Sequence, residues 1–102
     1  MDKMEFLPLG SVVTMKRMDG KFMIVSRGVL MPTGEETFFL DYRAVRWPLG
    51  MVDDQLAYFD QIAIKEVLFK GYDDDMNKLM NDRLNEYMEA NQPLNRIKTE
   101  LE

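Results

Sequence analysis

Two apolar runs joined by a tight turn, between Leu7 and Leu30, constrain the fold of this chain more than any other feature. The first run, at residues 12–15, reads Val-Val-Thr-Met and is apolar or β-branched on both faces, as is typical of a strand covered on both sides. Asp19-Gly20 indicates a hairpin turn, because glycine accepts a positive φ without strain. A second strand is expected from Lys21 to about Val29, so the chain begins with an antiparallel hairpin.

Further along, the pattern predicts two more strands and two helices, and it favours a third, short helix in the C-terminal tail. Residues 1–6 resemble a loose leader. The turn at residues 31–36 implies that the strands form an antiparallel meander, because short connections join antiparallel strands. The remaining elements are expected at residues 37–46 (third strand), 54–59 (short helix capped by Asp53), 62–70 (fourth strand) and 74–90 (long helix). Gln92-Pro93 ends the long helix, and Pro93 is a favourable start for a short helix on which Leu94, Ile97 and Leu101 share a side.

These elements predict an α+β fold, with an antiparallel sheet of about four strands packed against a long C-terminal helix. The sheet is either open or curled into a half barrel. A chain of 102 residues fits one domain. We assign residues 1–90 to that domain and residues 91–102 to a C-terminal tail, with or without its short helix.

The composition excludes most routes to catalysis. The sequence has no cysteine and no histidine, so thiol nucleophiles, thiolate zinc sites and imidazole bases are absent. Asp73-Asp74-Asp75 is the most noticeable cluster, and it has two interpretations, a carboxylate site for a divalent cation or the capped, acidic start of a helix. We favour the cap, since successive helical residues point about 100° apart and do not converge. The chain is therefore expected to be no enzyme and to carry no metal or cofactor.

Charge and hydropathy bear on location and partners. No apolar run approaches the ~20 residues that a membrane span needs, and the N-terminus lacks the apolar core of a signal peptide, so a cytoplasmic protein without membrane contact is expected. Residues 11–52 carry six basic and four acidic side chains, whereas residues 53–102 carry six and twelve. The acidic half suits a basic protein partner and disfavours nucleic acid. A small nucleic-acid-binding barrel using Arg27, Arg43 and Arg46 is kept as a lesser alternative.

The long helix offers the candidate site, a surface for a protein partner. Its apolar residues spread over an arc near 180°, wider than the ~100° that one core contact needs, and Arg83 falls inside that arc. Methionine, which is common on adaptable binding surfaces, supplies half of the stripe. Either the whole stripe packs on the sheet, or one flank packs there while the other, with the tail, binds a partner. The candidate partner-binding residues are Met76, Met80, Arg83, Leu84, Tyr87, Met88, Leu94 and Ile97.

A series of short motifs carries a family resemblance. In order they are Leu-Pro-Leu-Gly-Ser-Val-Val-Thr-Met-Lys from residue 7, Met-Ile-Val-Ser-Arg-Gly-Val from 23, Phe-Leu-Asp-Tyr from 39, Trp-Pro-Leu-Gly from 47 and Val-Leu-Phe-Lys-Gly-Tyr from 67. Over roughly residues 7–90 this series resembles a family of small proteins catalogued as a domain of unknown function. That family is encoded beside type VII secretion genes and LXG polymorphic toxins of Gram-positive bacteria.

The resemblance implies a cytoplasmic accessory protein of the type VIIb system. It implies a non-enzymatic chaperone or adaptor that binds the toxin domain of an LXG-type toxin and keeps it soluble before export. It brings no catalytic or binding residues. An immunity protein that neutralises the same toxin is the alternative, because both would bind the same client.

Overall fold

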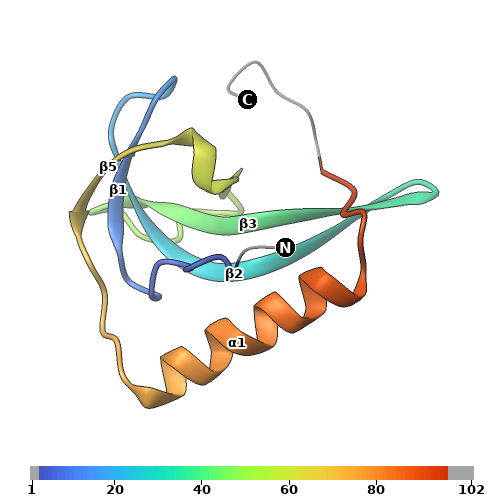
Figure 1. Ribbon diagram of the computed structural model, residues 1–102. Helices are drawn as coiled ribbons and strands as arrows, with labels where there is room; N and C mark the ends of the chain where they lie inside the picture. The colour runs from blue at the N-terminus through green and yellow to red at the C-terminus, as the bar shows by residue number, and fades with distance from the viewer. Residues whose placement is uncertain (1–2, 97–102) are drawn as a thin grey trace.

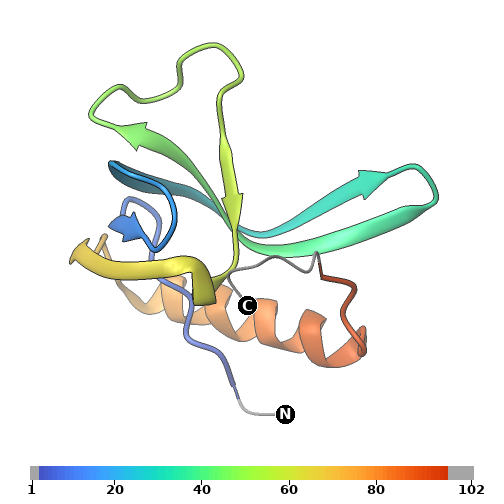
Figure 2. The ribbon, with the colours of Figure 1, turned by 90° about the horizontal axis from the view of Figure 1, so that it is seen from above.

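The structure, a computed structural model, describes residues 3–96 and consists of one open sheet and one long helix. All five strands are antiparallel, in the order β4-β3-β2-β1-β5. Helix α1 crosses one side of the sheet, and the β2–β3 hairpin projects well beyond it (Figures 1 and 2). The elements are β1 (Val12–Met15), β2 (Lys21–Thr33), β3 (Glu36–Trp47), β4 (Ala57–Phe59), a 3-10 turn η1 (Gln61–Ala63), β5 (Ile64–Phe69) and α1 (Asp75–Ala90). The α+β prediction is confirmed, with five strands in a sheet that does not close into a barrel.

The β2–β3 hairpin is longer than predicted and bends where α1 crosses it. Val25 has no partner in the β2–β3 register, which marks a bulge, and Gly28 adopts a φ of 61°. A Cβ at Gly28 would lie 2.4 Å from Leu84 Cδ2. Glycine at this position therefore allows the helix to approach the strand closely.

The stretch between β3 and β5 is the main error of the sequence-based prediction. Residues 54–59 do not form a helix: Asp53 sits in a turn with a φ of 53°, and β4 pairs with β3 through Phe59 opposite Tyr42. A three-residue strand forms because of the strand that it pairs with, not because of its own sequence. The helical spacing of apolar residues at 54–59 therefore led to a wrong prediction. The predicted fourth strand begins later, as β5, after η1.

The N-terminal segment, described from residue 3 onward, is hydrogen-bonded to α1 through Met4 and Phe6, in contrast to the loose leader that the sequence predicts for residues 1–6. Asn85 Oδ1 accepts the Met4 N–H at 2.7 Å and Asn85 Nδ2 donates to the Met4 carbonyl at 2.8 Å. One turn earlier, Asn81 Oδ1 accepts the Phe6 N–H at 2.8 Å. The two asparagines thus pair with the segment as a neighbouring strand would, and Phe6 is buried in the core.

The core lies between the sheet, the N-terminal segment and α1, with Tyr42 near its centre. The Tyr42 hydroxyl accepts the Leu7 N–H at 2.8 Å and donates to Gln61 Oε1, so it joins three parts of the chain. Burial raises the pKa of Tyr42 to about 12. The buried cluster is Phe6, Val13, Met15, Phe22, Ile24, Phe39, Tyr42, Ala44, Phe59, Ala63, Leu84 and Met88.

After α1 the chain returns to the free edge of β3. The Phe39 N–H donates to the Asn95 carbonyl at 2.8 Å, and Asn95 Nδ2 donates to the Thr37 carbonyl at 3.2 Å. Arg96 forms ion pairs of 3.0 Å with both Asp41 and Asp60. Residues 93–96 are not helical. The rest of the predicted short helix, with Ile97 and Leu101, lies outside the described residues.

Candidate protein-binding surface

Helix α1 begins at a cap that the acidic triplet supplies. Asp74 Oδ1 accepts the Asn77 N–H at 2.9 Å, which satisfies one of the free donors at the helix start. Asp73 accepts a hydrogen bond from Asn77 Nδ2 and lies near Lys78 and Lys70, and these contacts lower its pKa. Within residues 3–96, no group of three acidic side chains is arranged to hold a metal ion. The cap interpretation of the triplet is confirmed.

Four large apolar side chains of α1 remain exposed to solvent. Met76 is 79% exposed, Leu79 54%, Met80 42% and Tyr87 40%. They lie within about 100° of one another on the helix, with Arg83 among them, because each residue turns the helix by about 100°. Tyr87 also stacks on Phe39 of β3 at a centroid distance of 6.1 Å, which joins the exposed flank to the core. We refer to Met76, Leu79, Met80, Arg83 and Tyr87 as the helix flank.

Leu84 and Met88 occupy a different side of the helix from the one that a partner could reach. They are 8% and 4% exposed and belong to the core cluster. Gly28 explains the position of Leu84, since the missing side chain at that point lets Leu84 fill the space against β2. The prediction that these two residues contact a partner is therefore corrected: they hold α1 on the sheet.

The two remaining candidates belong to the tail. Leu94 is partly buried against the core, so it fastens the segment that follows α1. Ile97 lies outside the described residues. Of the eight predicted residues, Met76, Met80, Arg83 and Tyr87 are therefore the ones found together on an exposed surface.

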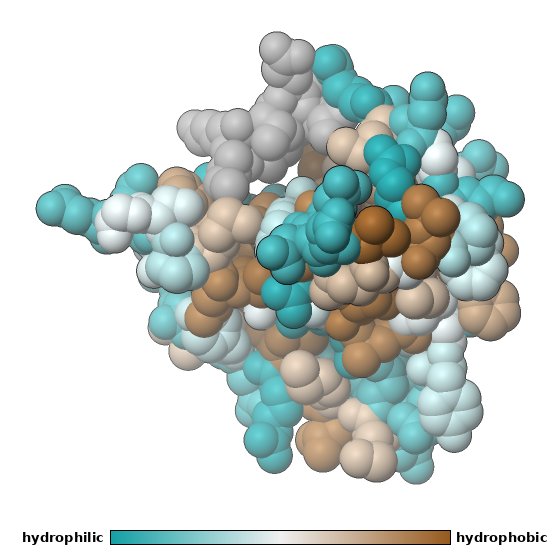
Figure 3. All heavy atoms as spheres, turned by 180° about the vertical axis from the view of Figure 1, so that it is seen from behind, coloured by the Kyte–Doolittle hydropathy of each residue, from teal (hydrophilic) through white to brown (hydrophobic). Residues whose placement is uncertain are grey.

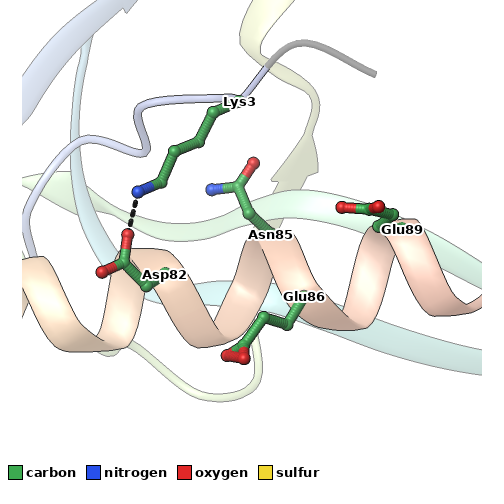
Figure 4. Close-up of a pocket in the computed structure, with 5 residues that line it drawn as sticks. All are labelled: Lys3, Asp82, Asn85, Glu86 and Glu89. Carbon is green, nitrogen blue, oxygen red and sulfur yellow. Dashed lines mark ion pairs between the residues drawn. The ribbon is translucent and has the colours of Figure 1, made fainter.

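Acidic side chains border the helix flank. A hollow beside α1 is lined by Lys3, Asp82, Asn85, Glu86 and Glu89, and Figure 4 shows the Lys3 ammonium pointing at Asp82 while the two glutamates lie apart from it. Glu86 and Glu89 are exposed. The helix thus presents an apolar flank beside a row of carboxylates, an arrangement that suits an apolar anchor with basic neighbours.

The three arginines of the nucleic-acid alternative do not share a face. Arg27 points to α1 and donates to Asn77 Oδ1, and burial lowers its pKa. The Arg46 guanidinium lies 5.0 Å from the ring centroid of Phe22, a core residue, whereas Arg43 Nε donates to Ser26 Oγ. Phe22 pairs with Arg46 and Ser26 with Arg43 on either side of the β2 bulge. No common basic surface results from these three side chains.

A buried charge cluster escaped the sequence analysis. Asp41 is only 3% exposed; besides its ion pair with Arg96, it accepts the Gln61 N–H at 2.8 Å. Burial raises the pKa of Asp41, although the Gln61 N–H and Arg96 act in the opposite direction. The sequence offered no signal for this cluster, since Asp41 and Arg96 lie 55 positions apart.

Fold and surface together define a small α+β domain whose conspicuous exposed feature is an apolar helix flank. None of the helices within residues 3–96 is long and apolar enough to cross a membrane. The chain belongs to the family described as a domain of unknown function (DUF4176), whose family model matches residues 6–80. No curated protein and no solved structure matches it.

Proposed function

We propose that this chain is a non-enzymatic, cytoplasmic chaperone or adaptor that binds an LXG-type toxin and stabilises it for type VIIb secretion. The observation that carries this proposal is the helix flank, where four large apolar side chains stay exposed on a helix that the core already holds from an adjacent side. Contiguous exposed apolar surface of this kind is typical of protein-binding sites. The secretion and toxin assignment rests on the resemblance of the ordered motifs between residues 7 and 90.

The side chains of the helix flank suit a client that is incompletely folded. Methionine is unbranched and polarizable, so Met76 and Met80 adapt to partners of different shape. Arg83 and Tyr87 are residue types that often supply much of the binding free energy at interfaces. The neighbouring carboxylates favour a basic client and discourage an acidic one.

Capture of the client should depend on the helix flank. The protein is co-expressed with the neighbouring LXG toxin gene, and the complex is recovered by pull-down and identified by mass spectrometry. We expect the M76D/M80D variant to bind the toxin at least about tenfold more weakly, since a carboxylate in the interface centre is left without a partner. Circular dichroism should show an unchanged fold, because both side chains are exposed.

Met51 supplies the matched control. It is 62% exposed in the loop between β3 and β4, so M51D makes the same kind of substitution, at one position instead of two, on a different part of the surface. Equal toxin capture by M51D and wild type is expected. If M76D/M80D captures the toxin as well as M51D does, the helix flank is not the client site.

A second experiment separates a chaperone from an immunity protein. Deleting a chaperone should lower the amount of toxin in the cell and its export without killing the cell. Deleting an immunity protein should kill cells that make active toxin and spare those that make a catalytically dead toxin. Death confined to cells with active toxin would overturn the chaperone proposal in favour of immunity.

A further inference from the structure

The sheet has a second apolar face, opposite the core, on which large side chains stay exposed near β1 and β5, whereas Val45 of β3 is buried. On β1, Val13 and Met15 are buried in the core, while Val12 and Thr14 point to the other face and are partly exposed. Phe69 is 62% exposed and Trp47 49%. The sequence of β1 predicts that both of its faces are covered, whereas residues 3–96 bury Val13 and Met15 on one face and leave Val12 and Thr14 partly exposed on the other.

The strand register arranges this outer face in two rows that run across four strands. The apolar row is Phe69 (β5), Val12 (β1), Met23 (β2) and Val45 (β3). The mixed row is Glu66 (β5), Thr14 (β1), Lys21 (β2) and Trp47 (β3). Each row runs perpendicular to the strands, because directly paired residues point to the same face.

A β-bulge brings Glu66 and Phe69 to the same face. In a regular strand two residues three positions apart would point to opposite faces. Between the pairs Val12–Phe69 and Val13–Val67 the register skips Leu68, and this shift places both Glu66 and Phe69 opposite outer-face residues of β1. Bulges also discourage an edge strand from pairing with another strand. The outer face, rather than the β5 edge, is therefore the surface left to be covered.

The outer face is hollowed and largely apolar. Val12, Met23, Trp47, Leu68 and Phe69 line a groove of about 500 Å³, together with Gly10 and Lys21. From behind, hydrophobic side chains gather across the middle of the molecule, with hydrophilic ones between and around them (Figure 3). A contiguous apolar groove with one cation in its lining favours an apolar partner that also brings a carboxylate.

We propose that this face binds a second copy of the chain, in a face-to-face dimer whose two-fold axis runs parallel to β1. Such an axis exchanges β5 with β2 and brings β1 against itself. Lys21 then faces the partner subunit's Glu66, and Met23 faces the partner subunit's Phe69. Val12 lies against its own equivalent on the axis. The outer face thus complements itself in charge and in hydropathy, as a closed two-fold interface requires.

The charged groups that would pair across this dimer, Lys21 and Glu66, have no ion-pair partner within residues 3–96. Thr14 Oγ1, midway between them in the mixed row, is the buried side-chain oxygen that has no hydrogen-bond partner in this part of the chain. Rotation about χ1 would turn it toward the equivalent hydroxyl across the axis. Met23 against Phe69 adds a sulfur–aromatic contact.

Charge exchange between the two ends of the mixed row tests the dimer. Sedimentation equilibrium or light scattering on the full chain should show a mass near twice 12.0 kDa at micromolar concentration. K21E and E66K each place like charges together twice per dimer, so each should raise the dimer dissociation constant by at least about tenfold. The double variant K21E/E66K restores opposite charges and should return the constant to within about threefold of wild type.

Trp47 gives a second readout, because it is the sole tryptophan and lies beside Lys21 in the mixed row, at the rim of the proposed dimer. Its quenching by acrylamide should decrease as the wild-type concentration rises and stay constant for K21E. K78E, which makes the same charge change on α1, serves as the control and should dimerise as wild type does. A monomer at all concentrations up to several hundred micromolar overturns the proposal, and so does a K21E/E66K variant that dissociates as readily as the single variants. The helix flank lies on the other side of the sheet, so either result leaves client capture untouched.

Discussion

Asp41 and its partners fix the segment that follows the helix, and they do so with buried charge. Arg96 places its guanidinium 5.2 Å from the ring centroid of Phe39 and between the carboxylates of Asp41 and Asp60. Burial alone would lower the pKa of Arg96, but the two carboxylates raise it overall. Removing one member of such a group leaves the others desolvated and uncompensated, which costs more than the intact cluster contributes.

Arg96→Ala is therefore expected to lower the free energy of unfolding by about 2 kcal/mol at pH 7, measured by urea denaturation. The loss should be smaller at pH 4. Burial already raises the pKa of Asp41 above 3.8, so the folded state binds this proton more tightly than the unfolded chain. The stability contributed by Asp41 is complete below pH 3.8 and declines as the pH rises through the folded pKa. Removing Arg96 raises the folded-state pKa of Asp41 further. This widens the pH range over which protonated Asp41 stabilises the folded state.

The double variant D41N/R96A is the control for this pH dependence. An amide cannot ionise, yet its oxygen still accepts the Gln61 N–H, so the difference between pH 4 and pH 7 should shrink relative to R96A alone. An equal loss of stability for R96A at both pH values would contradict the assigned role of Asp41.

For single residues, the sequence predicted the helix cap at Asp74 and few other roles. The role of Asp74 followed from its position before an apolar stripe, because capping is a local interaction. The roles of Asn81 and Asn85 did not follow, although both stand one helical turn apart beside Leu84 and Met88. Their partner is the backbone of Met4, 77 and 81 positions away, and no local pattern specifies such a contact.

Among the elements, the contact of α1 with β2 decides how the helix lies. Gly28 and Leu84 are in contact at the bend of the hairpin, and Gly34 at the hairpin tip has the same φ of 61° with no atom within 4 Å of a Cβ. The two glycines therefore share one backbone conformation and differ in what surrounds them.

Gly28→Ala should destabilise the protein by about 2 kcal/mol more than Gly34→Ala in chemical denaturation. Both substitutions strain a positive φ, and the strain is common to both, so the difference isolates the collision with Leu84. Adding L84A to G28A should recover part of that difference, since the two sites are in contact. Equal destabilisation by the two glycine substitutions would show that α1 does not depend on close approach at Gly28.

Element by element, long patterns predicted the structure and short ones did not. The first hairpin, the third strand and the long helix were placed within a few residues, because apolar periodicity and Asp19-Gly20 act locally. β4 was missed because three residues carry too little pattern, and its pairing with β3 alone defines it. Lys65 and Glu66 are exposed on the edge strand β5, but only the register shows the bulges that orient this strand.

Over the whole molecule, charge is divided between the two halves of the sequence. The acidic half includes α1, where Glu86 and Glu89 are exposed beside the helix flank. The electric field of such an acidic surface mainly changes the rate at which a charged partner associates. Salt screens this field over about 10 Å at 0.1 M. The sequence alone gave this asymmetry, whereas the division of the α1 stripe into a buried and an exposed side required the sheet.

The client's association rate, measured by stopped-flow or surface-based kinetics, should fall by about tenfold as NaCl rises from roughly 50 to 500 mM. E86K/E89K should slow association at low salt and flatten this dependence. Its control is E35K/E36K, which makes the same change in net charge at the exposed tip of the β2–β3 hairpin. If the client's association rate changes neither with salt nor in E86K/E89K, the client is not recognised through the acidic side of α1.

The pairing of Met4 with Asn85 has a consequence for how the chain folds. The N-terminal segment has its hydrogen-bond partners on α1, and α1 has its apolar support on the sheet, so each part needs the other two in place. Closing a loop of about 80 residues is slow. Its entropy cost is offset only when the sheet, the N-terminal segment and the helix are in contact together. We therefore expect helix docking and completion of the core to be a single late event, and the domain to unfold as one cooperative unit.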